Sequence, residues 1–106
     1  MKFTIAIIPG DGIGPEVTNQ AKKALSAVAD TYNHVFLYKE AQMGACAIDK
    51  TGDPLPEETV EICRNADAIL FGAIGDVKYD NDPSLRIRPE QGLLRLRKEL
   101  DLFCNV

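Results

Sequence analysis

The feature that most constrains the fold is the apolar, isoleucine-rich run at residues 3–8, which leads directly into a glycine-rich loop. Such a run predicts a strand covered on both faces, as in a parallel sheet. The loop that follows, Pro-Gly-Asp-Gly-Ile-Gly at residues 9–14, permits positive φ or close backbone approach. Pro15 and Glu16 then suit the first turn of a helix. The order strand, glycine loop, helix is typical of an α/β fold.

The rest of the chain continues this alternation. The helix after Pro15 is expected to bury one face, made of Val17, Ala21, Ala24, Leu25 and Val28. A second strand is predicted at residues 35–39, a turn-rich segment at 49–56, and a helix from 57 to about 66 with Val60 and Cys63 inward. A third buried strand is predicted at residues 68–74. The pattern predicts an α/β protein with a mainly parallel sheet flanked by helices.

The last two segments are a helix and an incomplete strand. A polar loop at residues 75–88 precedes a helix at about residues 88–100. Residues 102–106 resemble a strand that stops without a turn or cap. Because a buried parallel strand should not be the free end of a finished domain, we expect residues 1–106 to be a fragment of a longer protein.

The helix at residues 88–100 carries a row of side chains suited to a ligand. Glu90 and Arg97 are seven positions apart, which is about 700° of rotation and roughly 10 Å along the axis, so they share a face. Leu93 and Leu94 lie between them. An acceptor, an apolar patch and a guanidinium in a row fit a ligand with a hydroxyl-bearing part, a hydrocarbon branch and a carboxylate.

A purely structural interpretation of the same helix stays open. Leu93, Leu96 and Leu100 could form the buried stripe of an amphipathic helix with solvated charges around it. Five of the twelve basic residues fall within thirteen positions, at Arg86, Arg88, Arg95, Arg97 and Lys98. This local positive field suits a small anionic ligand, and it suits a solvated face equally well.

Composition excludes several classes of partner. A net charge of −4 and a pI near 4.9 argue against nucleic acid or an anionic membrane as the main partner. The three cysteines lack C-x-x-C spacing, which favours a reducing cytosol over a disulfide framework or a zinc site. No leader pattern and no apolar run near twenty residues is present. We therefore expect a soluble, cytoplasmic protein.

The glycine loop is an ambiguous nucleotide signal. A strand, a glycine turn and a helix N-terminus can bind phosphate. However, the dinucleotide fingerprint G-x-G-x-x-G fails at its third glycine, where Pro15 stands, and Glu40 lies thirty residues after Gly10 instead of about twenty. A structural role for the glycines is as well supported as a ligand role. The P-loop, H-E-x-x-H and G-x-S-x-G motifs are absent.

Four segments carry a resemblance to a known family. Residues 7–17 resemble the opening of the decarboxylating β-hydroxyacid dehydrogenases, a group that includes isocitrate, isopropylmalate, homoisocitrate and tartrate dehydrogenases. Residues 47–56, 72–75 and 87–98 are similar, within that group, to the 3-isopropylmalate dehydrogenases. The resemblance extends over essentially all 106 residues.

The resemblance implies an α/β fold that is not of the Rossmann type, with NAD held by loops. It also implies that residues 1–106 are the N-terminal portion of the first domain of a longer two-domain dehydrogenase. It implies that Arg97 binds a malate carboxylate, that Leu93 and Leu94 contact the isopropyl branch, and that Glu90 lies between the substrate and the nicotinamide ribose. The NAD site would be lined by Ile13 and by residues of the segment 76–90, among them Asp76, Val77, Lys78 and Asp80.

The implied chemistry is NAD-dependent oxidation of the 2-hydroxyl of 3-isopropylmalate followed by loss of CO₂, in leucine biosynthesis. Mg²⁺ or Mn²⁺ would assist, with its ligands and the catalytic residues beyond residue 106, and the complete enzyme would be a homodimer. Alternatives are homoisocitrate or tartrate/malate dehydrogenase, or a non-catalytic nucleotide-binding α/β module. A leucine pair favours isopropylmalate over isocitrate, because an uncompensated carboxylate against leucine is costly.

Overall fold

Three parallel strands form the sheet in the part of the chain that the computed structural model describes, residues 1–76, 79 and 87–102. The order is β2-β1-β3, with β1 (Lys2–Gly10) in the centre, β2 (Val35–Glu40) on one side and β3 (Ala68–Ala73) on the other. Ile5 pairs with Tyr38 of β2 and with Ala68 of β3. The predicted parallel α/β architecture is confirmed.

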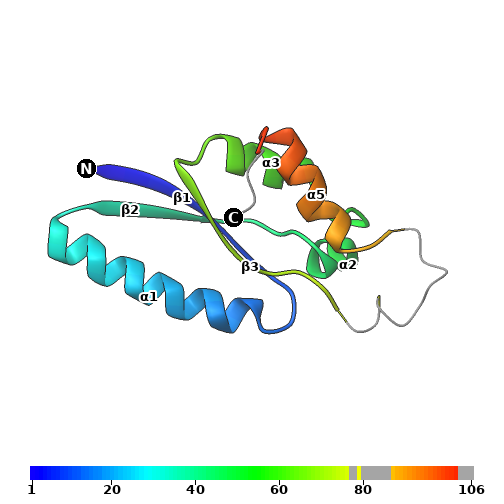
Figure 1. Ribbon diagram of the computed structural model, residues 1–106, viewed down its shortest axis with the longest axis horizontal. Coiled ribbons are helices and arrows are strands. Elements are labelled where there is room, and N and C mark those ends of the chain that lie inside the picture. Colours follow the sequence, from blue (N-terminus) through cyan, green and yellow to red (C-terminus); the bar gives the residue numbers. More distant parts are fainter. Residues whose placement is uncertain (77–78, 80–86, 103–106) are drawn as a thin grey trace.

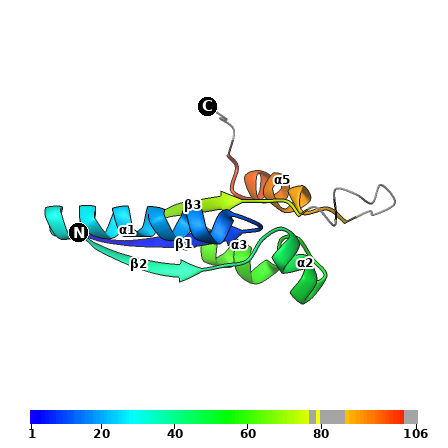
Figure 2. The ribbon, with the colours of Figure 1, turned by 90° about the horizontal axis from the view of Figure 1, so that it is seen from below.

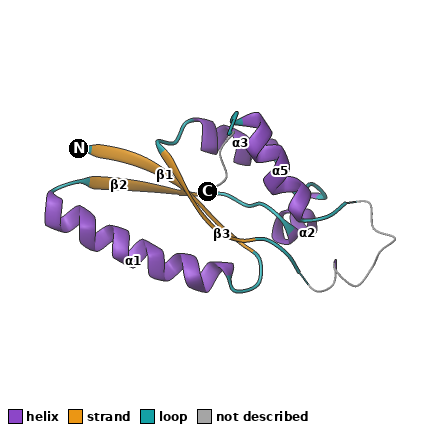
Figure 3. Ribbon diagram, in the orientation of Figure 1, coloured by secondary structure: helices purple, strands orange, loops and turns teal. Residues whose placement is uncertain are grey.

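Helices cover both faces of this sheet. The helix α1 (Gly14–Tyr32) lies along one face, and α2 (Ala45–Thr51), α3 (Glu57–Arg64) and α5 (Glu90–Glu99) lie on the opposite side (Figures 1 and 2). Figure 3 shows the same layers by type of element, with the sheet between helices. The loops that follow β1 and β3 leave the sheet at the same edge, because these strands are parallel neighbours.

The hydrophobic core lies between β1 and the α3 and α5 helices. Successive side chains of a strand point to opposite faces, so Ala6 and Ile8 of β1 enter this core while Ile5 and Ile7 face α1. The buried members of the core are Ala6, Ile8, Ala41, Met43, Leu55, Val60, Cys63 and Leu96. The predicted inward positions of the third helix, Val60 and Cys63, are confirmed.

The predicted buried face of α1 is only partly right, because Ala21 and Leu25 are half-buried but Val17, Ala24 and Val28 are exposed. Val17 is 53% exposed and Val28 is 44% exposed, whereas the buried residues of the helix are Gly14, Thr18 and Ala29. The start of the helix determines this rotation: Gly14 N donates to Asp11 O at 2.8 Å, which brings Gly14 down onto the sheet. Small residues therefore face the strands, although the spacing of the larger apolar residues had indicated another face.

Two further predictions need correction. Residues 45–51 form the helix α2, part of which had been assigned to a turn-rich segment. β3 is half-buried instead of fully buried, and Phe71 is 36% exposed, because β3 is an edge strand in the described part of the chain. The strand predicted at residues 102–106 falls mostly outside the described residues, and Leu102 itself is not in a strand.

Candidate functional site

The helix α5 forms where the sequence predicted it. Pro89 precedes it and is fully buried, Glu90 complements the positive helix N-terminus, and Arg97 and Lys98 occupy the last turn. At the other end Leu102 N donates to Arg97 O at 2.8 Å, with Asp101 in a left-handed conformation at φ 57°. The helix is thus terminated by its own backbone.

One side of α5 packs on the core. Leu96 is buried, and Leu93 and Leu100 are partly buried against the core cluster. The amphipathic interpretation is therefore correct for these three leucines. Leu94 differs, because it is 62% exposed and belongs to the solvent side of the helix. The predicted ligand-facing row thus contains one leucine that packs partly inward and one that is available for contact.

The basic residues near α5 differ in whether their guanidinium groups have a partner in the described part of the chain. Arg95 Nη1 lies 2.8 Å from Asp53 Oδ1, and Arg88 Nη1 donates to Tyr79 O at 2.9 Å. Arg97 is half-buried, and its guanidinium has no hydrogen-bond or ion-pair partner among residues 1–76, 79 and 87–102. A partly desolvated cation in this situation gains from an anionic ligand.

Glu90, at the other end of the row, lies beside the segment that follows β3. A Cβ placed on Gly75 would be 3.5 Å from Glu90 Oε1, so the exposed carboxylate of Glu90 reaches the backbone immediately before Asp76. Ile13 is 69% exposed in the loop after β1, at the same edge of the sheet. Asp76 is half-buried, whereas Val77, Lys78 and Asp80 lie outside the described residues.

Sequence reasoning missed a buried and fully hydrogen-bonded carboxylate at this edge, that of Asp11. Its Oδ2 accepts hydrogen bonds from Ala45 N at 2.7 Å and Gly75 N at 3.0 Å, and its Oδ1 accepts one from Cys46 N at 2.8 Å. Its own N donates to Ala73 O at 2.7 Å. We call these contacts the Asp11 clamp. The clamp joins the loop after β1, the start of α2 and the start of the segment after β3.

Gly44 explains why the Asp11 clamp can form. Gly44 precedes α2 at φ 90°, and a Cβ there would lie 2.5 Å from Asp11 Oδ2. The helix has no side-chain cap of its own, so the carboxylate of Asp11 supplies the cap from a distant part of the sequence. The signal in the sequence was the single acidic residue inside the glycine loop, Asp11 between Gly10 and Gly12.

The cysteines near the site are not activated as nucleophiles. Burial, and then the neighbouring Asp11 carboxylate, raise the pKa of the Cys46 thiol, whose Sγ donates to Met43 O at 3.4 Å. Burial raises the pKa of Cys63. Both thiols therefore stay protonated at neutral pH. They are poor nucleophiles, because the thiolate is the reactive form.

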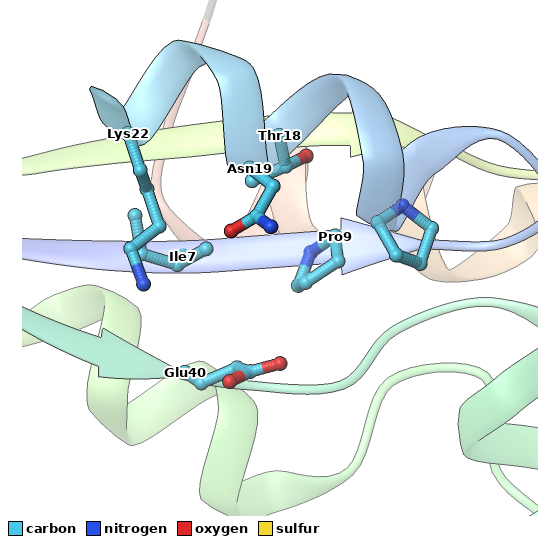
Figure 4. Close-up of a pocket in the computed structure, with 7 residues that line it drawn as sticks. Ile7, Pro9, Thr18, Asn19, Lys22 and Glu40 are labelled. Atoms are coloured by element: carbon cyan, nitrogen blue, oxygen red, sulfur yellow. The ribbon is translucent and has the colours of Figure 1, made fainter. Parts of the chain in front are cut away.

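Three surface depressions in the described part of the chain lie away from the row on α5. One of about 220 Å³ is lined by Ile7, Pro9, Pro15, Thr18, Asn19, Lys22 and Glu40, between α1 and the ends of β1 and β2 (Figure 4). Thr18 Oγ1 is buried without a partner in the described chain, but it lies toward Gly72 and away from Glu40. The polar side chains that Figure 4 shows directed toward this depression are those of Asn19, Lys22 and Glu40, and none of them belongs to the row on α5.

The described residues contain neither a candidate metal site nor a membrane-spanning helix. Within residues 1–76, 79 and 87–102, no three His, Cys, Asp or Glu side chains cluster in a way that could hold a metal ion. None of the helices in that same part of the chain has the length and apolar character needed to cross a bilayer.

Known proteins match this chain along its whole length. The sequence model of the isocitrate/isopropylmalate dehydrogenase family matches residues 4–106. The chain is 56% identical over 106 residues to a 3-isopropylmalate dehydrogenase of Bacteroides fragilis, covering 100% of this chain and 30% of the relative. It is 55% identical over 106 residues to the 3-isopropylmalate dehydrogenase of Bacillus subtilis, covering 100% of this chain and 29% of that relative.

Solved structures agree with the sequence matches. A β-decarboxylating dehydrogenase from Thermococcus kodakarensis, in its apo form, superposes with a TM-score of 0.74 and 36% identity, over 95% of this chain and 27% of that one. An isocitrate dehydrogenase from Methylococcus capsulatus gives a TM-score of 0.56 and 29% identity, over 70% of this chain and 22% of that one. The chain thus spans about 30% of the length of the curated relatives that it matches.

Proposed function

The chain belongs to the isocitrate/isopropylmalate dehydrogenase family, and we propose that it forms the first part of the first domain of an NAD-dependent enzyme that oxidises and decarboxylates 3-isopropylmalate. This reaction would serve leucine biosynthesis. The identity of 56% to a relative named 3-isopropylmalate dehydrogenase supports the choice of substrate within the family.

One structural observation carries the proposal: the half-buried Arg97 guanidinium has no partner in the described part of the chain, while Arg95 on the same helix is paired with Asp53. A carboxylate of the substrate would complete the hydrogen bonding of Arg97 in a bidentate pair, which a guanidinium fork favours. Arg95 is already neutralised by its own chain and is not available for this role.

The two leucines of the row would recognise the hydrocarbon branch of the substrate. The exposed Leu94, with the partly buried Leu93 beneath it, would contact the isopropyl branch. The same leucines would reject isocitrate, because its additional carboxylate would lose water without gaining a partner. The row would therefore distinguish an alkyl branch from a charged one.

The proposed NAD site lies at the edge of the sheet where the loops after β1 and β3 meet. There the Glu90 carboxylate beside Gly75 is exposed and can accept hydrogen bonds from ribose hydroxyls. Ile13 and Asp76 would line the same site, and so would Val77, Lys78 and Asp80 in the segment between Asp76 and Glu90. This arrangement fits a dinucleotide held by loops.

The reaction needs two groups that are not part of the polypeptide. NAD would accept the hydride, and Mg²⁺ or Mn²⁺ would act as a Lewis acid. As the resemblance to the family implies, we propose that the metal ligands and the catalytic residues lie beyond residue 106, and we assign none to this chain. The role of residues 1–106 would be to bind and orient the substrate and NAD.

Assembly and location follow from the same proposal. We propose that the complete enzyme is a homodimer that works in the cytoplasm, with no nucleic acid or membrane partner. The free thiols of Cys46 and Cys63 are compatible with a reducing compartment. Size-exclusion chromatography with light scattering on the complete protein tests the dimer, for which a mass of twice the monomer is expected.

The test of the reaction uses the complete protein that carries this chain. It is mixed with NAD, Mg²⁺ and one 2-hydroxy acid at a time, and NADH absorbance at 340 nm is followed. We expect the highest kcat/KM with 3-isopropylmalate. A preference for homoisocitrate, tartrate or malate would replace the proposed substrate, and no turnover with any of them would favour a non-catalytic nucleotide-binding module.

A further inference from the structure

The Asp11 clamp connects the glycine loop after β1 to the segment that begins at Gly75. Asp11 belongs to the glycine loop, and one of its three partners, Gly75, begins the segment that leads through Asp76 to Glu90. We propose that Asp11 is a positioning residue for NAD, which holds Gly75 and Asp76 in the place where they contact the cofactor. The inference depends on the proposed NAD site and adds a residue to it.

Both oxygens of Asp11 are engaged in the clamp. Its three backbone donors lie within 3.0 Å and come from two segments, the start of α2 and the residue after Ile74. The residue is 6% exposed, so these hydrogen bonds replace water around the carboxylate almost completely. Hydrogen bonds to an ionised group are stronger than neutral ones, and releasing one in a buried place leaves an N–H unsatisfied.

Besides the clamp, another hydrogen bond between described residues attaches this segment to α2. Asp49, in the second half of α2, accepts a hydrogen bond from Tyr79 Oη at 2.9 Å. Tyr79 O in turn accepts from Arg88 Nη1 at 2.9 Å, just before α5. Gly75 and Tyr79 are therefore attached to the same short helix, which Asp11 caps.

The consequence for NAD follows from the position of Glu90. Its Oε1 would lie 3.5 Å from a Cβ on Gly75, so the carboxylate sits against the backbone that Asp11 holds. If Gly75 moved, Asp76 and the space in front of Glu90 would move with it. The row from Leu94 to Arg97 would be affected less, because α5 is also held in the core by the buried Leu96.

A second carboxylate in the chain offers a matched control. Asp67 Oδ2 accepts a hydrogen bond from Thr4 N at 2.8 Å, which is also a carboxylate–backbone contact. Asp67 lies just before β3, at the edge of the sheet opposite to Gly75, and it is exposed. Replacing Asp67 by Asn therefore changes a similar bond without touching the proposed NAD site.

The experiment compares Asp11→Asn and Asp67→Asn in the complete enzyme. In Asp11→Asn one acceptor oxygen becomes an NH₂ group that faces backbone donors, so the clamp loosens. We expect KM for NAD to rise about tenfold or more, while KM for 3-isopropylmalate and kcat at saturating NAD change less than about threefold. Asp67→Asn should leave all three constants close to wild type. A KM for NAD within about twofold of wild type in Asp11→Asn, or an equal rise in both KM values, would overturn the inference.

A milder variant keeps the inference testable if Asp11→Asn does not fold. Tyr79→Phe removes only the hydroxyl that donates to Asp49, and we expect KM for NAD to rise about threefold or more. An unchanged KM in a folded Tyr79→Phe enzyme would then decide against the inference.

Binding of NAD alone separates this inference from the proposed reaction. NAD is titrated against the wild-type and variant enzymes without substrate, and the NAD-induced rise in melting temperature is recorded for each. A weaker Kd in Asp11→Asn than in Asp67→Asn supports the role of Asp11 even if 3-isopropylmalate proves not to be the substrate. Equal Kd values, or no binding of NAD by the wild type, reject it.

Discussion

Arg95 and Arg97 are two positions apart on α5, but the structure gives them different surroundings. Arg95 pairs with Asp53, whose Oδ1 also accepts from Leu55 N at 2.9 Å, so this guanidinium fastens α5 to the loop after α2. Arg97 turns to a half-buried position without a partner in the described residues. A charge with a partner in its own chain contributes to the fold, whereas a charge without one is available to a ligand.

Arg97→Lys tests this distinction in the complete enzyme. Lysine keeps the charge but loses the bidentate fork, and we expect kcat/KM for 3-isopropylmalate to fall at least about tenfold, equivalent to roughly 1.5–3 kcal/mol. Arg95→Lys is the control, and its kcat/KM should stay within about threefold of wild type. Equal losses in the two variants would remove Arg97 from the substrate site.

Leu94→Ala tests whether this exposed leucine contacts the isopropyl branch of the substrate. Because Leu94 is 62% exposed, its removal should cost little stability. We expect a loss of about 1–3 kcal/mol in transition-state binding for 3-isopropylmalate but not for malate, which has no branch. Steady-state kinetics with both substrates measures the difference, and a loss of the same size for both would mean that Leu94 does not contact the branch.

Local signals predicted the residues of α5 but not Asp11. Pro89, Glu90 and Arg97 follow general preferences of helix termini, which a sequence displays directly. Asp11 acquires its role from Ala45, Cys46 and Gly75, which are 34, 35 and 64 positions away along the chain. No periodicity or motif connects positions so far apart, so only the folded arrangement could reveal the clamp.

At the scale of elements, the strands were easier to predict than the helices between them. The apolar run of β1 and the pattern around β3 indicated strands because burial dictates their composition. The helix α2 was missed because it has seven residues and takes its cap from Asp11 in place of a local side chain. The buried face of α1 was predicted only in part, at Ala21 and Leu25, because Gly14 and Thr18, two small residues, make the close contacts with the sheet.

The position of α5 depends on a glycine, which gives a prediction for the whole element. A Cβ on Gly92 would lie 2.5 Å from Pro54 O and 3.0 Å from Met43 Cγ. Alanine would gain about 1 kcal/mol of helix propensity, but overpacking against backbone costs about 1–3 kcal/mol. We therefore expect Gly92→Ala to lower the melting temperature of the complete enzyme and its kcat/KM, as α5 is displaced.

Lys98→Ala is the matched control for Gly92→Ala on the same helix. Lys98 is exposed, so its replacement should leave both the melting temperature and kcat/KM close to wild type. An unchanged melting temperature in Gly92→Ala would show that Pro54 and Met43 move aside without cost.

At the scale of the whole molecule, the described chain leaves much apolar surface uncovered. Val17 and Val28 on α1, Val35 and Leu37 on β2, and Phe71 on β3 are among its exposed large hydrophobic residues. β2 and β3 are also the two edge strands of the described sheet. Exposed apolar side chains next to free strand edges favour association.

We therefore predict that the isolated 106-residue chain associates or melts without cooperativity. Light scattering and circular dichroism on the purified chain measure both properties. In the complete enzyme the same surface should be buried, so that Val28→Asp lowers stability there. A monomeric isolated chain with a sharp melting transition would mean that this surface needs no cover.

The central claim is that α5 presents Leu94 and Arg97 to a branched hydroxy acid while Glu90 faces the cofactor. A crystal structure of the complete enzyme with 3-isopropylmalate and NAD bound tests it most directly. We predict the Arg97 guanidinium within about 3 Å of a substrate carboxylate, Leu94 in contact with the isopropyl group, and Glu90 next to the nicotinamide ribose. A substrate bound away from α5, with Arg97 paired to another part of the protein, would contradict the account.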